Sequence, residues 1–99
     1  YEAARAQARR AGDRGLIAAT AMNLGIIATI RGELPRALSF YRRAVADLRT
    51  LDRPGDLAAA LNNLGLAYVS MQRLDDAEAA YREAADAGDN ASTWYGLTA

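Results

Sequence analysis

Apolar and polar positions along the chain alternate with the spacing of helices. Large apolar side chains recur at three- and four-residue intervals in two segments, at about 14–30 and at about 35–50. The segments of about 54–71 and 75–87 repeat this spacing. The pattern therefore predicts an all-α chain in which these four segments are helices.

Short breaks separate the predicted helices. Gly32 is predicted to supply a turn, and Pro35 suits the first turn of the helix that follows. Gly88 is predicted to end the helix of about 75–87. The predicted helix caps are Asp13, either Asp52 or Asp56 beside Pro54, and Asn90.

The sequence repeats itself with a period of forty residues. Tyr1, Tyr41 and Tyr81 are each followed three residues later by Ala, and the triplet NLG at 23–25 recurs at 63–65. Such a period indicates helix pairs that stack on one another and bury a continuous core. We therefore expect one domain-sized fragment that begins and ends within a repeat. Its predicted parts are residues 1–12, the second helix of a preceding repeat; 13–52, repeat one; 53–89, repeat two; and 90–99, the first helix of a further repeat.

Charge and composition exclude several classes of function. The net charge is zero, with twelve basic and twelve acidic residues, which argues against a nucleic-acid groove or a membrane-surface patch built on bulk charge. Cys and His are absent, so disulfides, zinc sites and Cys- or His-based catalysis lack their residues. No apolar run approaches the length of a membrane span. We expect a cytoplasmic protein, and the Arg- and Ala-rich composition is typical of a GC-rich bacterial genome.

The charges are unevenly distributed. Residues 1–57 carry ten arginines and six acidic residues, whereas residues 58–99 carry two arginines and six acidic residues. A chain with oppositely charged halves can stack end to end with copies of itself. Random variation of helix surfaces is the alternative explanation.

The repeated positions resemble the tetratricopeptide repeat. That family places Leu-Gly, then a Tyr, in the first helix of each unit, and Ala with an aromatic residue in the second. The matching residues here are Leu61, Leu64, Gly65, Tyr68, Ala77, Tyr81 and Ala84 in the second unit, and Leu24, Gly25, Gly32, Leu34, Ala37, Tyr41 and Ala44 in the first.

The chain departs from the family pattern in its period, which exceeds the usual 34 residues, and in the late proline, which Arg49 and Asp89 replace. The long period is similar to that of repeats in kinesin light chains and in bacterial regulators. The resemblance implies a right-handed α-α superhelix, a solenoid of antiparallel helix pairs. Its first helices would line a concave groove.

Small residues are predicted where helices cross closely. Gly25 and Gly65 allow two backbones to approach, because a β-carbon there would push them apart. The predicted packing residues are Gly25, Gly65, Ala37, Ala77, Tyr41 and Tyr81.

Asn63, and Asn23 in the equivalent place, are predicted to face the groove. An Asn side chain has two donors and an acceptor, so it can hold both the N–H and the C=O of a bound backbone. Hydrogen bonding to a neighbouring helix or to water is the alternative. By analogy with the family, the expected partner-binding residues are Met22, Asn23, Ile26, Thr29, Ile30, Asn62, Asn63, Leu66, Val69 and Ser70.

The predicted function is a non-enzymatic protein–protein interaction module that binds a peptide or a helix, within a larger regulatory or scaffold protein. A self-associating structural module and a small-ligand sensor domain are the alternatives. The acidic cluster of Asp75, Asp76, Glu78 and Glu83 falls in the first half of a helix, where its opening residues suit the helix dipole, so no catalytic or metal site and no cofactor are expected. Met22 and Ile26 stand where a clamp for a terminal carboxylate would need polar groups, which makes such a clamp unfavourable.

Overall fold

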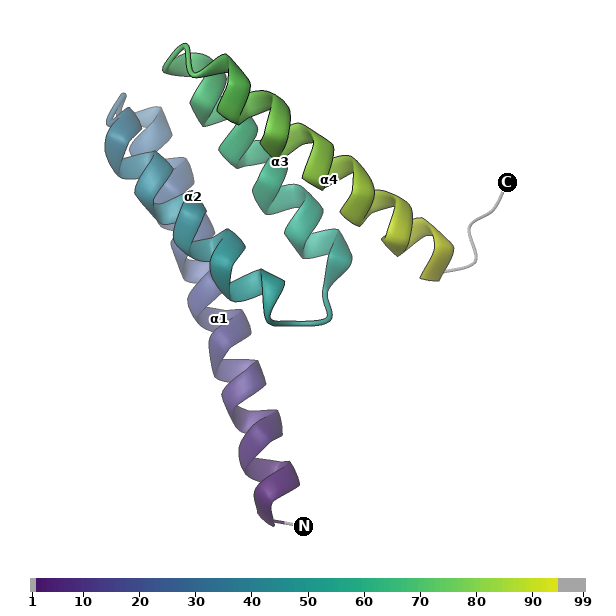
Figure 1. Cartoon of the computed structure of the whole chain (residues 1–99). Coiled ribbons are helices and arrows are strands. Elements are labelled where there is room, and N and C mark those ends of the chain that lie inside the picture. Colours follow the sequence, from purple (N-terminus) through teal and green to yellow (C-terminus); the bar gives the residue numbers. More distant parts are fainter. Residues whose placement is uncertain (1, 95–99) are drawn as a thin grey trace.

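Four helices in two antiparallel pairs make up the chain (Figure 1). The computed structural model describes the backbone of residues 2–94 and the side chains of residues 9, 10 and 12–88. The helices are α1 (Glu2–Ile30), α2 (Leu34–Arg49), α3 (Pro54–Ser70) and α4 (Leu74–Trp94), and there is no strand within residues 2–94. The predicted all-α fold of helix pairs is confirmed, whereas the right-handed superhelical course stays a prediction.

The pairs are α1 with α2 and α3 with α4, and contacts between α2 and α3 join them. α2 descends toward the connection at its end and α3 runs back from it, so these two neighbours are antiparallel (Figure 1). α3 therefore has a helix on each side, α2 and α4, whereas α2 is the main neighbour of α1.

The turns inside the two pairs have the same geometry forty residues apart. Gly32 has a φ of +76°, and Gln72 has a φ of +62°. In the first turn the N–H of Glu33 donates to the carbonyl of Ala28 at 2.9 Å, and the equivalent bond from Arg73 to Tyr68 measures 2.8 Å. These bonds satisfy carbonyls left without partners at each helix end, as in a Schellman motif.

The predicted helix caps are wrong. Arg53 occupies the N-cap position of α3, Glu33 occupies that of α2, and neither makes a side-chain capping bond. Proline lies in the first turn of both helices, as the sequence predicts. Because proline presets the helical φ and has no N–H to satisfy, these starts need no carboxylate cap.

The predicted helix breaks near residues 12 and 88 are also absent. α1 continues from Glu2 to Ile30, and α4 continues from Leu74 to Trp94. Gly12 and Gly88 keep a negative φ, and an interior Gly costs about 1 kcal/mol relative to Ala, which does not by itself end a helix. The division of the chain into repeat units stays a prediction.

The core is formed by alanines, by leucines such as Leu61, and by the rings of Tyr41 and Tyr68. Ala37 and Ala44 of α2 are 0% exposed, and Tyr41 is 4% exposed. The ring of Tyr41 lies so close to Gly25 that a β-carbon there would be 2.5 Å from Cε1. Gly65 faces Tyr81 in the same way, at 2.7 Å. The close approach of each first helix therefore depends on a glycine facing a tyrosine.

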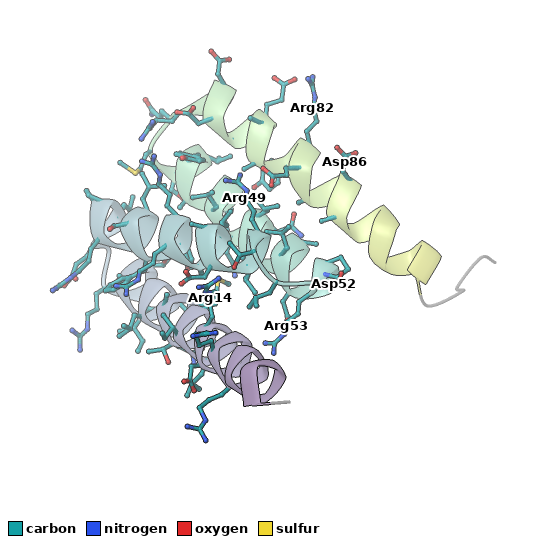
Figure 2. All side chains as sticks on the ribbon, turned by 60° about the horizontal axis from the view of Figure 1, so that its bottom comes forward. Arg14, Arg49, Asp52, Arg53, Arg82 and Asp86 are labelled. Atoms are coloured by element: carbon teal, nitrogen blue, oxygen red, sulfur yellow. The ribbon has the colours of Figure 1, made fainter. Side chains whose placement is uncertain are left out.

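An ion pair connects the two helix pairs across α3. Nε and Nη2 of Arg49 on α2 donate to the two carboxylate oxygens of Glu83 on α4, at 2.9 and 2.6 Å. This hydrogen bonding raises the pKa of Arg49, an effect that partial burial opposes and the carboxylate charge reinforces. In Figure 2, Arg49 lies between the ribbons of its own helix and α4.

Candidate functional site

Most of the predicted groove residues of α1 are exposed in the described structure. Ile26 is 42% exposed and Ile30 is 81% exposed, although both are large and apolar. Asn23 is exposed, and Met22 is half-buried. An isoleucine that is four-fifths exposed has no packing role within the described chain.

α3 presents a matching surface. Leu66, forty residues after Ile26, is 56% exposed, while Asn62 is exposed and Asn63 half-buried. Hydrogen bonds of the described side chains involve arginine, hydroxyl and carboxylate groups, and none involves the amides of Asn23, Asn62 or Asn63. We call the surface formed by Met22, Asn23, Ile26 and Ile30 of α1 with Asn62, Asn63 and Leu66 of α3 the α1/α3 surface.

A hollow of about 260 Å³ lies between α1 and α3. It brings Met22 and Asn23, which the sequence predicted to face the groove, together with Ala59 of α3. Its other lining residues are Gly15, Ala18, Ala19, Leu48, Arg53 and Asp56, of which Arg53 and Asp56 are charged.

Arg53 and Asp56 were not predicted to line a site. Arg53 reaches from the connection between α2 and α3 toward α1, where Gly15 leaves the space that its guanidinium occupies (Figure 2). Nearby, Nη1 of Arg14 donates to Oγ1 of Thr50 at 3.1 Å. Gly15 was the available signal in the sequence, because a glycine inside a helical pattern costs helix stability and often has a packing reason.

Three more of the predicted site residues make contacts within the chain. The hydroxyl of Thr29 donates to the carbonyl of Gly25 at 2.9 Å and lies 3.1 Å from the hydroxyl of Tyr41. The hydroxyl of Ser70 donates to the carbonyl of Leu66 at 3.1 Å. Val69 lines a different hollow with residues of α4, among them Leu74 and Tyr81. The donors of both hydroxyl groups are therefore used within the chain, and the role of these three residues in partner binding stays a prediction.

Three of the acidic residues of α4 take part in separate ion pairs. Asp76 accepts from Arg73 at 2.8 Å, Glu78 from Arg82 at 2.5 Å, and Glu83 from Arg49 on α2. Across the described residues, no group of three or more acidic side chains is placed to hold a metal ion. Within that same part of the chain, no helix is both long and apolar enough to cross a membrane.

Comparison with known families identifies the repeat. A model of the tetratricopeptide repeat matches residues 18–90, which is most of the chain and includes α2 and α3 entirely. The chain belongs to the tetratricopeptide repeat family. No curated protein and no solved structure gives a match. Repeats of this family generally mediate protein–protein interactions, so the chain is expected to have protein partners.

Proposed function

We propose that the chain binds an amphipathic helix or an apolar extended segment of a partner protein on the α1/α3 surface, without catalysing a reaction. The observation that carries this proposal is the exposure of Ile26, Ile30 and Leu66 beside three asparagines. Apolar side chains arranged along a helix suit an apolar stripe on a partner, whose burial supplies the affinity.

The asparagines give such a surface a means of holding a partner's main chain. Their amides make no hydrogen bond with the described protein groups, so their donors and acceptors remain available to a ligand backbone. An amide can satisfy both the N–H and the C=O of an extended peptide. Such contacts are independent of the partner's side chains, which leaves specificity to the apolar positions and the hollow.

The hollow fits one side chain of a partner better than a separate small ligand. Its volume of about 260 Å³ lies just below the range of about 300–1,000 Å³ typical of small-molecule pockets. Arg53 and Asp56 are at its wall, so a polar or charged side chain can be accommodated there. This favours an interaction module over a small-ligand sensor.

Selection from a displayed peptide library against the 99-residue chain would test the proposal. We expect the selected peptides to carry apolar residues at helical or alternating spacing. Leu66→Glu and Ile26→Glu should each weaken their binding by at least about tenfold, because a buried carboxylate without a partner costs more than about 1.4 kcal/mol.

Leu74→Glu is the matched control, since Leu74 is a comparably exposed leucine on α4, at 65% against 56% for Leu66. It should leave peptide binding unchanged. The proposed surface would be contradicted if Leu66→Glu and Leu74→Glu weakened peptide binding equally. It would also be contradicted if neither Ile26→Glu nor Leu66→Glu changed the affinity.

A further inference from the structure

The two ends of the row of helices carry apolar faces that the described chain leaves uncovered. The first, here called the α1 end face, borders a hollow of about 280 Å³ and includes Leu16, Ile17, Thr20, Leu24 and Ile27 of α1 with Phe40 and Arg43 of α2. The second, here called the α4 end face, includes Leu74, Glu78, Tyr81, Arg82 and Ala85. Neither face overlaps the α1/α3 surface.

The α1 end face has the character of an interior face. Leu64 and Ala67 of α3, which lies between two helices, are 6% and 4% exposed. Their equivalents forty residues earlier, Leu24 and Ile27, are 41% and 47% exposed. The apolar positions are thus retained in α1, although no second helix covers them. End repeats that face water normally carry a polar outer surface, which α1 lacks.

The ends of the described chain do not supply the missing helix. The sequence predicted that residues 1–12 would form a separate helix before this face, but residues 2–12 continue α1 in line. At the other end, α4 continues past Gly88 to Trp94. Figure 1 shows both extensions running away from the body of the molecule instead of folding across it.

The α4 end face is the forty-residue counterpart of a buried surface of α2, the helix that contacts α3: Tyr41 and Val45 are 4% and 2% exposed, whereas Tyr81 is 38% exposed and Ala85 is exposed. Leu34 and Tyr41 of α2 recur as Leu74 and Tyr81 of α4, and Val45 is replaced by the smaller Ala85. The packing of α2 on α3 within the chain is therefore a template for packing of α4 on the α1 of a second copy.

Opposite charges would meet if α4 of one copy packed on α1 of the next as α2 packs on α3, an alignment that we call the stacked register. Leu38, near the start of α2, lies in the same core cluster against which Met71, at the end of α3, packs. Their equivalents at the open ends are Glu78 and Arg31. Two positions that belong to or pack against the apolar core inside the chain are thus occupied by an anion and a cation at the open ends.

The positions equivalent to the Arg49–Glu83 pair also carry charges of opposite sign. The residue equivalent to Glu83 in the first pair is Arg43, which lines the α1 end face. The sequence has Asp at position 89, forty residues after Arg49. In the sequence the cation and the anion have exchanged positions, so that the α1 end face carries the cation, Arg43.

We propose that copies of this chain stack head to tail, with the α4 end face of one copy on the α1 end face of the next. The contact is heterologous, because the two faces differ. Each added copy leaves one open face of each kind, so assembly continues into a row or closes into a ring. This assembly leaves the α1/α3 surface open along each copy and does not depend on the proposed peptide binding.

Complementary blocked variants test the direction of stacking. Leu24→Asp blocks the α1 end face and Ala85→Asp blocks the α4 end face, both at positions exposed in the single chain. In sedimentation velocity from about 10 µM to about 1 mM, we expect concentration-dependent oligomers of the unmodified chain and monomers of each variant. An equimolar mixture of the variants should form a dimer and nothing larger, since each supplies the face that the other lacks.

Other outcomes overturn the proposal. These are a monomeric unmodified chain throughout this range, oligomers that persist in Ala85→Asp alone, or no dimer in the mixture. A variant that failed to fold would give no dimer in the mixture, so circular dichroism of each variant is recorded, and Leu24→Asn and Ala85→Asn replace any variant that loses helicity. Ile30→Asp, on α1 but outside the end face, is the matched control and should assemble like the unmodified chain.

Charge exchange provides a second readout. Arg31→Glu should weaken assembly by about two- to fivefold, as expected for exposed ion pairs, and Glu78→Arg in the same chain should restore it. Raising the salt from about 0.1 M to about 1 M should have the same weakening effect, because the Debye length falls from about 10 Å to about 3 Å. If neither the charge-exchange variants nor the added salt changed the strength of assembly, the stacked register would be contradicted.

Discussion

Gly25 and Gly65 have the same sequence context, but the rings that face them differ in freedom. Tyr41, opposite Gly25, is 4% exposed, and its hydroxyl lies 3.1 Å from that of Thr29. Tyr81, opposite Gly65, is 38% exposed, and position 69 has Val where the first pair has Thr29. The ring of Tyr81 can therefore turn outward more easily than that of Tyr41.

This difference predicts the order of two substitutions. Gly25→Ala should lower the free energy of unfolding by about 1–3 kcal/mol, because the new β-carbon overlaps a fixed ring, and Gly65→Ala should lower it by less. Urea denaturation measures both values. In the control Gly12→Ala, where no described atom lies within 4 Å, the better helix propensity of Ala should raise the free energy of unfolding by about 0.5–1 kcal/mol. Three equal values would refute this account of the glycines.

At the scale of the element, α1 differs most from the sequence prediction. The helix passes through Gly12 and Asp13 without interruption, whereas the pattern predicted that a helix would start at Asp13. Composition favoured a cap, because Asp is preferred at N-cap positions, but an interior Asp is also tolerated at small cost. Nothing near these residues in the sequence requires a positive φ or removes a backbone donor.

Asp13→Ala distinguishes the two situations. In a continuous α1 the substitution should change the free energy of unfolding by no more than about 0.5 kcal/mol, and in the stabilising direction, because Ala is the better helix former. Loss of a true N-cap would instead cost about 1 kcal/mol. Thermal and urea melts of the single variant decide between these values, and a loss of that size would show that α1 is broken at this point.

At the scale of the whole molecule, Arg49 and Glu83 couple the two helix pairs from helices that are not sequence neighbours. Both side chains are partly exposed, at 54% and 38%, so water and salt screen their attraction. A double-mutant cycle with Arg49→Ala and Glu83→Ala should give a coupling of about 0.2–1 kcal/mol, lost in high salt. Because the pKa of Arg49 is raised, this contribution is kept below the ordinary arginine pKa, as long as Glu83 carries its charge, and is lost as the pH rises through the raised value. A coupling above this range, or one unchanged by salt, would show that the pair is more strongly shielded than its exposure indicates.

The sequence by itself determined that the chain is a repeat of helix pairs. The spacing of Leu, Gly, Ala and Tyr is sufficient for this, because each residue has a local role that a different fold would not reuse forty residues later. The turn at Gly32 and the helix starts at Pro35 and Pro54 were equally local, since backbone φ and a missing donor act within a few residues.

Only the tertiary structure decided which surfaces these helices leave open. Thr29 and Val69 occupy equivalent positions, but one bonds to Tyr41 and the other lines the hollow beside α4. Arg53 reached the hollow through the course of the connection between α2 and α3, which periodicity does not specify. Whether a helical residue is buried depends on how many helices flank it, and for Leu24 and Leu64, identical in sequence, that number alone differs.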